Sequence, residues 1–212
     1  MRHDVSQMRI VVLGATGKTG RHVVAAALEG GHEVVIAARV PGSFGHHERL
    51  VEHTWTDLSD TKPISAALEN ADVVISTLGG ARKGVTTVCT DAMKTTVAAM
   101  NSSAVTRLIV LSAHGVLETH DRSLYSRAVW AAVGEKMKDK EAMEPVITNS
   151  ALHWTIVRPP TLRNTPATGS FEHGEDLQIR VWSSISRADL ARFLVREAED
   201  PKYVYKYPRI RR

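Results

Sequence analysis

Short apolar runs rich in β-branched residues alternate with longer amphipathic segments along this chain, and this alternation constrains the fold most strongly. Runs typical of buried strands cover residues 9–13, 33–38, 72–76, 107–112 and 154–158, and a weaker run covers 50–55. Segments with helical spacing cover residues 19–29, 60–70, 86–100, 134–150 and 186–199. Strands separated by helices form right-handed crossover units. The sequence therefore predicts an α/β fold, a doubly wound parallel sheet with helices on both faces.

Three details refine this prediction. Pro145 falls inside the helix expected over residues 134–150, so we expect a kink or a restart there. Residues 161–181 are polar and glycine-rich and receive no element, whereas the tail after residue 199 can add a strand. The chain contains no internal repeat and no linker, so residues 1–212 are predicted to form one domain. Sheets of this kind bind ligands beyond the carboxyl ends of their strands.

Composition narrows the function classes. The chain has 212 residues, 43% hydrophobic and 24% charged, which is typical of a globular protein. Cys89 is the only cysteine, so no internal disulfide can form, and the apolar runs are too short for a signal peptide or a membrane span. We therefore expect a soluble cytoplasmic protein without a membrane role. The net charge is +4, but the basic residues are dispersed and no aromatic platforms accompany them, so no nucleic-acid partner is expected.

The first strand runs directly into a glycine turn, and a helix follows at once. The turn reads Gly14-Ala-Thr-Gly17-Lys-Thr-Gly20. A tight turn favours glycine, and the close approach of a dinucleotide pyrophosphate to the backbone requires it. A nucleotide triphosphate loop would need a further glycine where Val12 stands. The glycines could serve the turn alone, but the strand–turn–helix context favours a dinucleotide site.

The second strand indicates which dinucleotide binds. NAD sites usually end this strand with an acid that binds the ribose 2′-hydroxyl. Here the strand ends Ala37-Ala38-Arg39, and a guanidinium can pair with a 2′-phosphate. A solvated loop arginine is the alternative interpretation. Arg39 therefore favours NADP over NAD.

Two further strand ends extend the predicted site. Asp57 and Leu58 follow the third strand, where the carboxylate could lie near the adenine amino group or cap a helix. The stretch Thr77-Leu78-Gly79 follows the next strand, where the backbone could pass close to the ribose and pyrophosphate.

Taken together, these motifs resemble those of a known family. They are the glycine turn, Ala38-Arg39, Ser76-Thr-Leu-Gly79, Leu111-Ser112-Ala, Trp154-Thr-Ile-Val-Arg-Pro-Pro160 and Ser186-Arg-Ala-Asp-Leu190. The chain is similar, from Met8 to about Pro208, to the NAD(P)H-binding, NmrA-like atypical short-chain dehydrogenases, and within them to the biliverdin-IXβ/flavin reductase type. The resemblance implies a Rossmann domain with a small C-terminal substrate lobe, in which residues 161–185 shape the substrate pocket. It also places the nicotinamide near Ser112 and Arg158.

The resemblance also predicts the site residues. We expect the cofactor to bind at Gly14, Thr16, Gly17, Lys18, Thr19, Gly20, Arg39, Asp57, Leu58, Thr77, Leu78, Gly79, Ser112, Arg158, Pro159 and Pro160. Ser112 and Lys140 are the expected catalytic residues. His114 could supply a proton, although an exposed position without a role fits it better. No metal is expected, because His46-His47-Glu48 and His120-Asp121 lack ligand spacing on a rigid element.

The chain departs from the usual short-chain dehydrogenase pattern, which pairs a tyrosine acid with a lysine four residues later. Lys140 takes the place of that lysine, but Lys136 stands where the tyrosine belongs, and Tyr125 is off register. The departure disfavours simple carbonyl reduction and agrees with the flavin/biliverdin type, which also lacks the tyrosine. That type carries a histidine where this chain has Thr161.

We therefore expect an NADPH-dependent reductase of a conjugated acceptor of the flavin, quinone or tetrapyrrole class. Such acceptors delocalise the incoming charge and can take their proton from solvent, so the enzyme supplies mainly proximity and orientation. The alternative is a redox sensor of the NmrA type, which binds the dinucleotide without turnover. Either protein would be a monomer or a small homo-oligomer.

Overall fold

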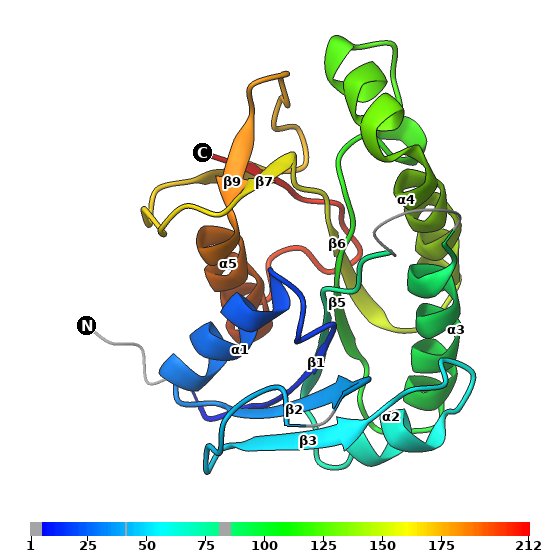
Figure 1. Cartoon of the computed structure of the whole chain (residues 1–212), viewed down its shortest axis with the longest axis vertical. Coiled ribbons are helices and arrows are strands. Elements are labelled where there is room, and N and C mark those ends of the chain that lie inside the picture. The colour runs from blue at the N-terminus through cyan, green and yellow to red at the C-terminus, as the bar shows by residue number, and fades with distance from the viewer. Residues whose placement is uncertain (1–5, 41, 81–85) are drawn as a thin grey trace.

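The computed structural model describes residues 6–40, 42–80 and 86–212, and it confirms the predicted doubly wound sheet (Figure 1). Six parallel strands form it in the order β3-β2-β1-β4-β5-β6. Their bounds are β1 Arg9–Leu13, β2 Glu33–Ala38, β3 Leu50–Thr54, β4 Val73–Ser76, β5 Arg107–Leu111 and β6 His153–Val157. The strand order reverses between β1 and β4, which places a topological switch point beside the glycine turn.

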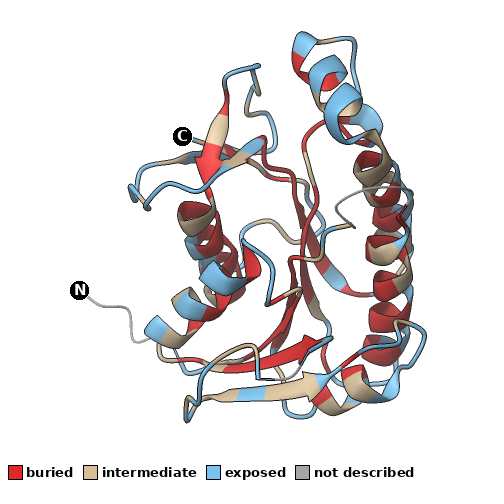
Figure 2. Cartoon of the chain, in the orientation of Figure 1, coloured by how far each residue is buried: buried red, intermediate tan, exposed pale blue. Residues whose placement is uncertain are grey.

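Helices cover both faces of this sheet (Figure 1). On one face lie α1 (Gly20–Glu29) and α5 (Arg187–Glu199), and on the other lie α2 (Lys62–Ala67), α3 (Val88–Asn101) and α4 (Leu124–Thr148). Alternate residues of β1 serve two separate cores: Ile10 and Val12 face α1 and α5, whereas Val11 and Leu13 face the other three helices. Figure 2 shows the central strands buried between the two layers.

A small lobe follows β6 and contains β7 (Thr161–Arg163), β8 (Glu172–Gly174) and β9 (Ser184–Ser186), which the sequence pattern did not predict, together with β10 (Arg209–Arg211). β7 pairs in parallel with β9, and β8 pairs antiparallel with β10. The strand expected in the C-terminal tail is therefore present as β10. The tail reaches it by running beside β6, where the Arg158 amide donates to the Pro208 carbonyl at 2.9 Å.

The helix expected over residues 134–150 differs from the prediction in length and in the place of its kink. It begins at Leu124, after Ser123, whose hydroxyl accepts a hydrogen bond from the Ser126 amide. Its non-helical residue is Val133 (φ −142°, ψ 31°), so the expected kink at Pro145 is wrong. Pro145 lies in the last turn, where little helix remains beyond it to be displaced.

The other elements match their predicted spans to within about two residues, apart from α2, which is shorter at both ends. A short 3₁₀ turn, Leu117–Thr119, precedes α4. Within the described ranges, every helix is too short or too polar to cross a membrane.

Candidate active site

The turn between β1 and α1 depends on two of its glycines. Gly14 has a φ of +73°, and a Cβ there would lie 2.9 Å from the Leu78 nitrogen. A Cβ on Gly20 would lie 2.2 Å from the Gly14 carbonyl oxygen. The end of β4 supports the same turn, because the Thr77 hydroxyl donates to the carbonyls of Leu13 and Gly14 at 3.1 and 3.2 Å. The turn and the β4 end are therefore packed backbone against backbone.

The amino end of α1 offers free N–H groups. The amides of Thr16, Lys18, Thr19 and Gly20 donate to no acceptor within the described part of the chain. Thr19, the residue before the helix, does not cap it with its side chain, and the first turn carries no acid. By contrast, serine side chains cap α4 and α5. An open helix start with unpaired amides binds anions. This geometry fits the pyrophosphate of a dinucleotide.

Arg39, Asp57 and Leu58 follow β2 and β3 at the same edge of the sheet. Arg39 is exposed and has no hydrogen-bond or ion-pair partner among the described residues. The Asp57 carboxylate is exposed and accepts hydrogen bonds from the Ser59 amide at 2.9 Å and hydroxyl at 2.7 Å, which lower its pKa. The alternative that Asp57 caps a helix is wrong, because Thr61 precedes α2. The Leu58 carbonyl accepts a hydrogen bond from Thr95 on α3.

Ser112 directly follows β5 and takes part in a buried polar cluster. Its hydroxyl donates to Glu144 of α4 at 2.5 Å. The same carboxylate, which is fully buried, receives the Arg158 guanidinium, with Nε at 3.2 Å and Nη2 at 2.5 Å. Arg158 also contacts the exposed Glu118 and lies 4.2 Å from the centre of the Tyr207 ring. One arginine thereby ties together β6, α4, the 3₁₀ turn and the tail.

Charge compensation keeps the Arg158 guanidinium and the Glu118 carboxylate ionised. Burial lowers the pKa of Arg158, but the hydrogen bonds that its guanidinium donates to Glu144 and Glu118 outweigh this effect and raise that pKa above the usual value. Burial likewise opposes ionisation of Glu118, and the hydrogen bond from Arg158 lowers its pKa overall. The guanidinium predicted to bind the cofactor is therefore held by two carboxylates. The neighbouring Pro159 and Pro160 are buried, and the Pro159 carbonyl accepts the His114 amide at 2.9 Å.

Lys140 lies close to Ser112 and directly follows Asp139, a second buried acid. Its ammonium group donates to the Leu111 carbonyl at 2.7 Å. The preceding residue, Asp139, is 3% exposed and accepts the Cys89 and Thr90 amides at 2.9 and 3.0 Å, so it caps α3 from another helix. Sequence reasoning missed Asp139, because a charged residue in a charged helix gives no sign of a distant partner.

His114 and Tyr125 form a buried pair beyond the end of β5. The expectation of an exposed His114 is wrong, since the residue is 8% exposed and its Nδ1 has no partner among the described residues. Burial, then the charge of Arg209, lowers its pKa to about 4, so the ring is neutral at pH 7. The Tyr125 ring centre lies 5.3 Å away. Burial raises the pKa of Tyr125 to about 12, and a hydrogen bond with Thr161 opposes the rise.

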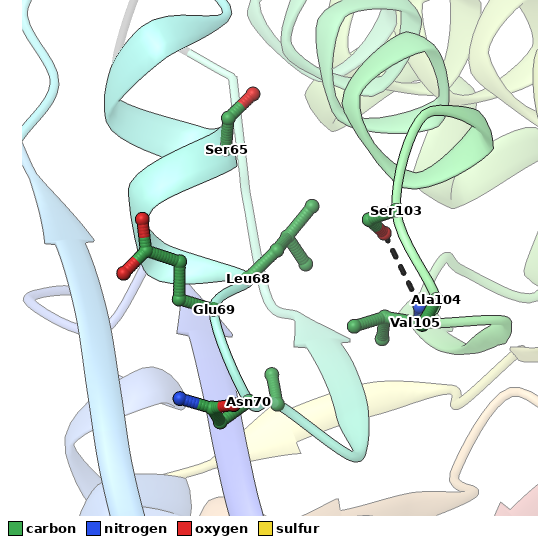
Figure 3. A pocket seen from close by; sticks show the side chains of 8 residues that line it. Ser65, Leu68, Glu69, Asn70, Ser103, Ala104 and Val105 are labelled. Carbon is green, nitrogen blue, oxygen red and sulfur yellow. Dashed lines mark hydrogen bonds between the residues drawn. The ribbon is translucent and has the colours of Figure 1, made fainter.

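A separate hollow of about 510 Å³ lies at the opposite edge of the sheet (Figure 3). It is lined by Ser65, Leu68, Glu69, Asn70, Ala71, Ser103, Ala104 and Val105. These residues precede β4 and β5, so they lie at the amino ends of those strands. The hollow is therefore not part of the site at the carboxyl edge.

Comparison with known proteins agrees with the turn geometry. Residues 14–201 match the model of a family described as NAD(P)H-binding. The chain belongs to this NAD(P)H-binding family. Its match begins at Gly14, the first residue of the turn, and extends into the small lobe.

Two curated proteins match this chain over most of their length, and a solved structure shares its fold. The UPF0659 protein YMR090W of Saccharomyces cerevisiae is 26% identical, covering 95% of this chain and 92% of that protein. The uncharacterized sugar epimerase YhfK of Bacillus subtilis is also 26% identical, with coverages of 91% and 89%. Among solved structures, ChuY, an anaerobillin reductase from Escherichia coli O157:H7, superposes with a TM-score of 0.81 at 23% identity, covering 95% of this chain and 96% of that one.

Proposed function

We propose that this protein is an NADPH-dependent oxidoreductase that transfers hydride to a conjugated acceptor. The observation that carries the proposal is the uncapped start of α1, where unpaired amides meet the glycine turn at the switch point of the sheet. The membership in an NAD(P)H-binding family supports it. The chain is proposed to act as one domain, 1–212, in the cytoplasm, in line with its single buried thiol.

The cofactor would lie along the carboxyl ends of the strands. Gly14, Thr16, Gly17, Lys18, Thr19 and Gly20 would hold the pyrophosphate, and Thr77, Leu78 and Gly79 would run beside the ribose. There is space for the ribose beside Gly79, where a Cβ would meet nothing within 4 Å. Arg39 would bind the 2′-phosphate, and Asp57 with Leu58 would border the adenine. Ser112, Pro159 and Pro160 would border the nicotinamide, with Arg158 held behind them by its carboxylates.

Bound NADPH would supply the hydride, so the protein's own residues need only bind and orient the two reactants. Lys136 stands where a tyrosine acid would be, and the ammonium group of Lys140 donates one hydrogen bond to the Leu111 carbonyl. His114 is neutral and Tyr125 is a weak acid. Because none of these four side chains is a ready proton donor, they favour an acceptor that takes its proton from solvent, such as a flavin, a quinone or a linear tetrapyrrole. The similarity in fold to ChuY, an anaerobillin reductase, is in line with a reductase function.

A dinucleotide sensor without turnover is the second candidate. The Ser112 hydroxyl, which would orient nicotinamide or substrate, donates instead to Glu144. A site held in this way could bind the cofactor and signal its redox state without passing on the hydride.

A mixing assay separates the two functions. Purified protein is incubated with NADPH and, in turn, FMN, dichlorophenolindophenol and biliverdin, and the absorbance of the reduced nicotinamide is followed. We expect protein-dependent oxidation with at least one acceptor. Binding of NADPH without oxidation by any of them would contradict the reductase and support the sensor.

A further inference from the structure

Three arginines in or beside the small lobe form no ion pair with an acid in the described part of the chain. Arg163 on β7 donates from Nε to the Ser184 hydroxyl at 3.0 Å. Arg187 donates to the Leu162 carbonyl and the Asn164 side chain, and Arg209 donates to the Leu177 carbonyl. All these acceptors are neutral oxygens. We propose that the acceptor carries an anionic group, a phosphate or a carboxylate, and that Arg163 binds it; the inference rests on the proposed reductase function.

The pleat of β7 fixes the direction of the Arg163 side chain. Leu162 and its register partner Ile185 pack into the core under α1 and α5. Side chains alternate along a strand, so Thr161 and Arg163 share the opposite face. The Ser184 hydroxyl bonded to Arg163 lies on that face too.

This face looks toward the end of β5. Thr161 hydrogen-bonds with Tyr125 of α4, and the Tyr125 ring packs against His114. His114 lies two residues beyond Ser112, where the nicotinamide is proposed to bind. Arg163 lies two strand residues past Thr161, roughly 7 Å from it. The arginine is therefore placed for the periphery of an acceptor whose reacting ring lies near Ser112.

The remaining charges of the lobe favour the same ligand. Arg187 is the first residue of α5, where the helix dipole disfavours a cation and where Asp189 is the acid of the first turn. The positive charge of Arg209 reaches both His114 and the exposed Glu118 and lowers the pKa of each. By contrast, Arg211 on the same lobe forms an ion pair with Glu172 at 2.8 Å. Guanidinium groups left without acids bind phosphate or carboxylate in a bidentate manner.

Two matched acceptor pairs test the proposal. FMN and riboflavin share the reacting ring and differ in the phosphate, whereas biliverdin and its dimethyl ester differ in the carboxylates. Initial rates are measured with wild type, Arg163→Gln and the control Arg211→Gln. We expect Arg163→Gln to raise KM for the charged member of at least one pair about tenfold, with KM for the neutral member unchanged. The pair that responds identifies the anion.

Further readouts keep the test decisive. KM for NADPH should be unchanged in Arg163→Gln, because a rise would place this arginine on the cofactor instead. Thermal unfolding checks that the exposed substitution leaves the fold intact. Equal effects on charged and neutral acceptors, or none on either, would overturn the proposal.

If no acceptor is reduced, the reductase function fails, and the anion site is tested separately. Quenching of flavin fluorescence then measures FMN and riboflavin binding directly, with tighter FMN binding in the wild type alone as the supporting result. Equal binding of the two flavins by the wild type would refute the anion site.

Discussion

Replacing Glu144 with glutamine should destabilise the protein far more than the same change at Glu118. The Glu144 side chain is 0% exposed and the Arg158 side chain 1%, whereas the Glu118 side chain is 62% exposed. Removing one charge of a buried pair costs about 3–5 kcal/mol. Because Glu118 stays on the guanidinium, Glu144→Gln should cost about 3 kcal/mol, near the lower end of that range. At Glu118 the exposed carboxylate is screened by water, so Glu118→Gln should cost less than about 1 kcal/mol.

Urea unfolding followed by circular dichroism measures both variants. For a chain of this size, about 3 kcal/mol corresponds to a melting temperature lower by roughly 6–12 °C. The slope of the unfolding free energy against urea concentration should be unchanged, because both variants expose the same surface on unfolding as the wild type. A Glu144→Gln variant within about 1 kcal/mol of the wild type, or equal to Glu118→Gln, would refute the buried ion pair as a main support of the β5–β6 edge.

Two further predictions concern the turn and the pH dependence. Gly79→Ala should leave the free energy of unfolding unchanged, since the new Cβ meets nothing within 4 Å, yet it should weaken NADPH binding in a fluorescence titration. Gly20→Ala should lower both the stability and the NADPH affinity, because its Cβ would lie 2.2 Å from the Gly14 carbonyl oxygen. Equal binding by Gly79→Ala and wild type would remove the cofactor from that loop. The unfolded chain binds a proton at His114 near pH 6.5, but the folded one only near pH 4, so this residue costs stability as pH falls through that window. Between pH 7 and pH 4.5 the unfolding free energy of His114→Gln should therefore fall less than that of the wild type, the difference reaching up to about 3 kcal/mol. Identical pH profiles of the two proteins would contradict the buried neutral histidine.

Local pattern was sufficient for the sheet and the glycine turn. Each central strand is a short β-branched run buried on both faces, so its hydrophobicity is continuous and easily read. The turn is equally local, because Gly14 and Gly20 answer steric demands within a few residues of themselves and from the adjoining β4 end. The strands and the glycine spacing could be predicted from local sequence, whereas the contact of Gly14 with the end of β4 is tertiary and could not.

Long-range polar contacts could not be predicted in this way. Glu144 and Asp139 lie in a charged helix, and their partners, Arg158 and the start of α3, are distant in the sequence. The kink at Val133 and the short strands of the lobe likewise depend on packing rather than on local pattern. A buried position for His114 had no local signal, since it is set by Tyr125 and the tail.

The central claim is that the glycine turn and Arg39 hold NADPH, and isothermal titration calorimetry tests it most directly. The wild type, Arg39→Gln and the control Arg192→Gln, an exposed arginine on α5, are titrated with NADPH and with NADH. The wild type and the control should bind NADPH about tenfold or more tightly than NADH, and Arg39→Gln should lose that preference while still binding both. No binding of either nucleotide to the wild type would contradict the account.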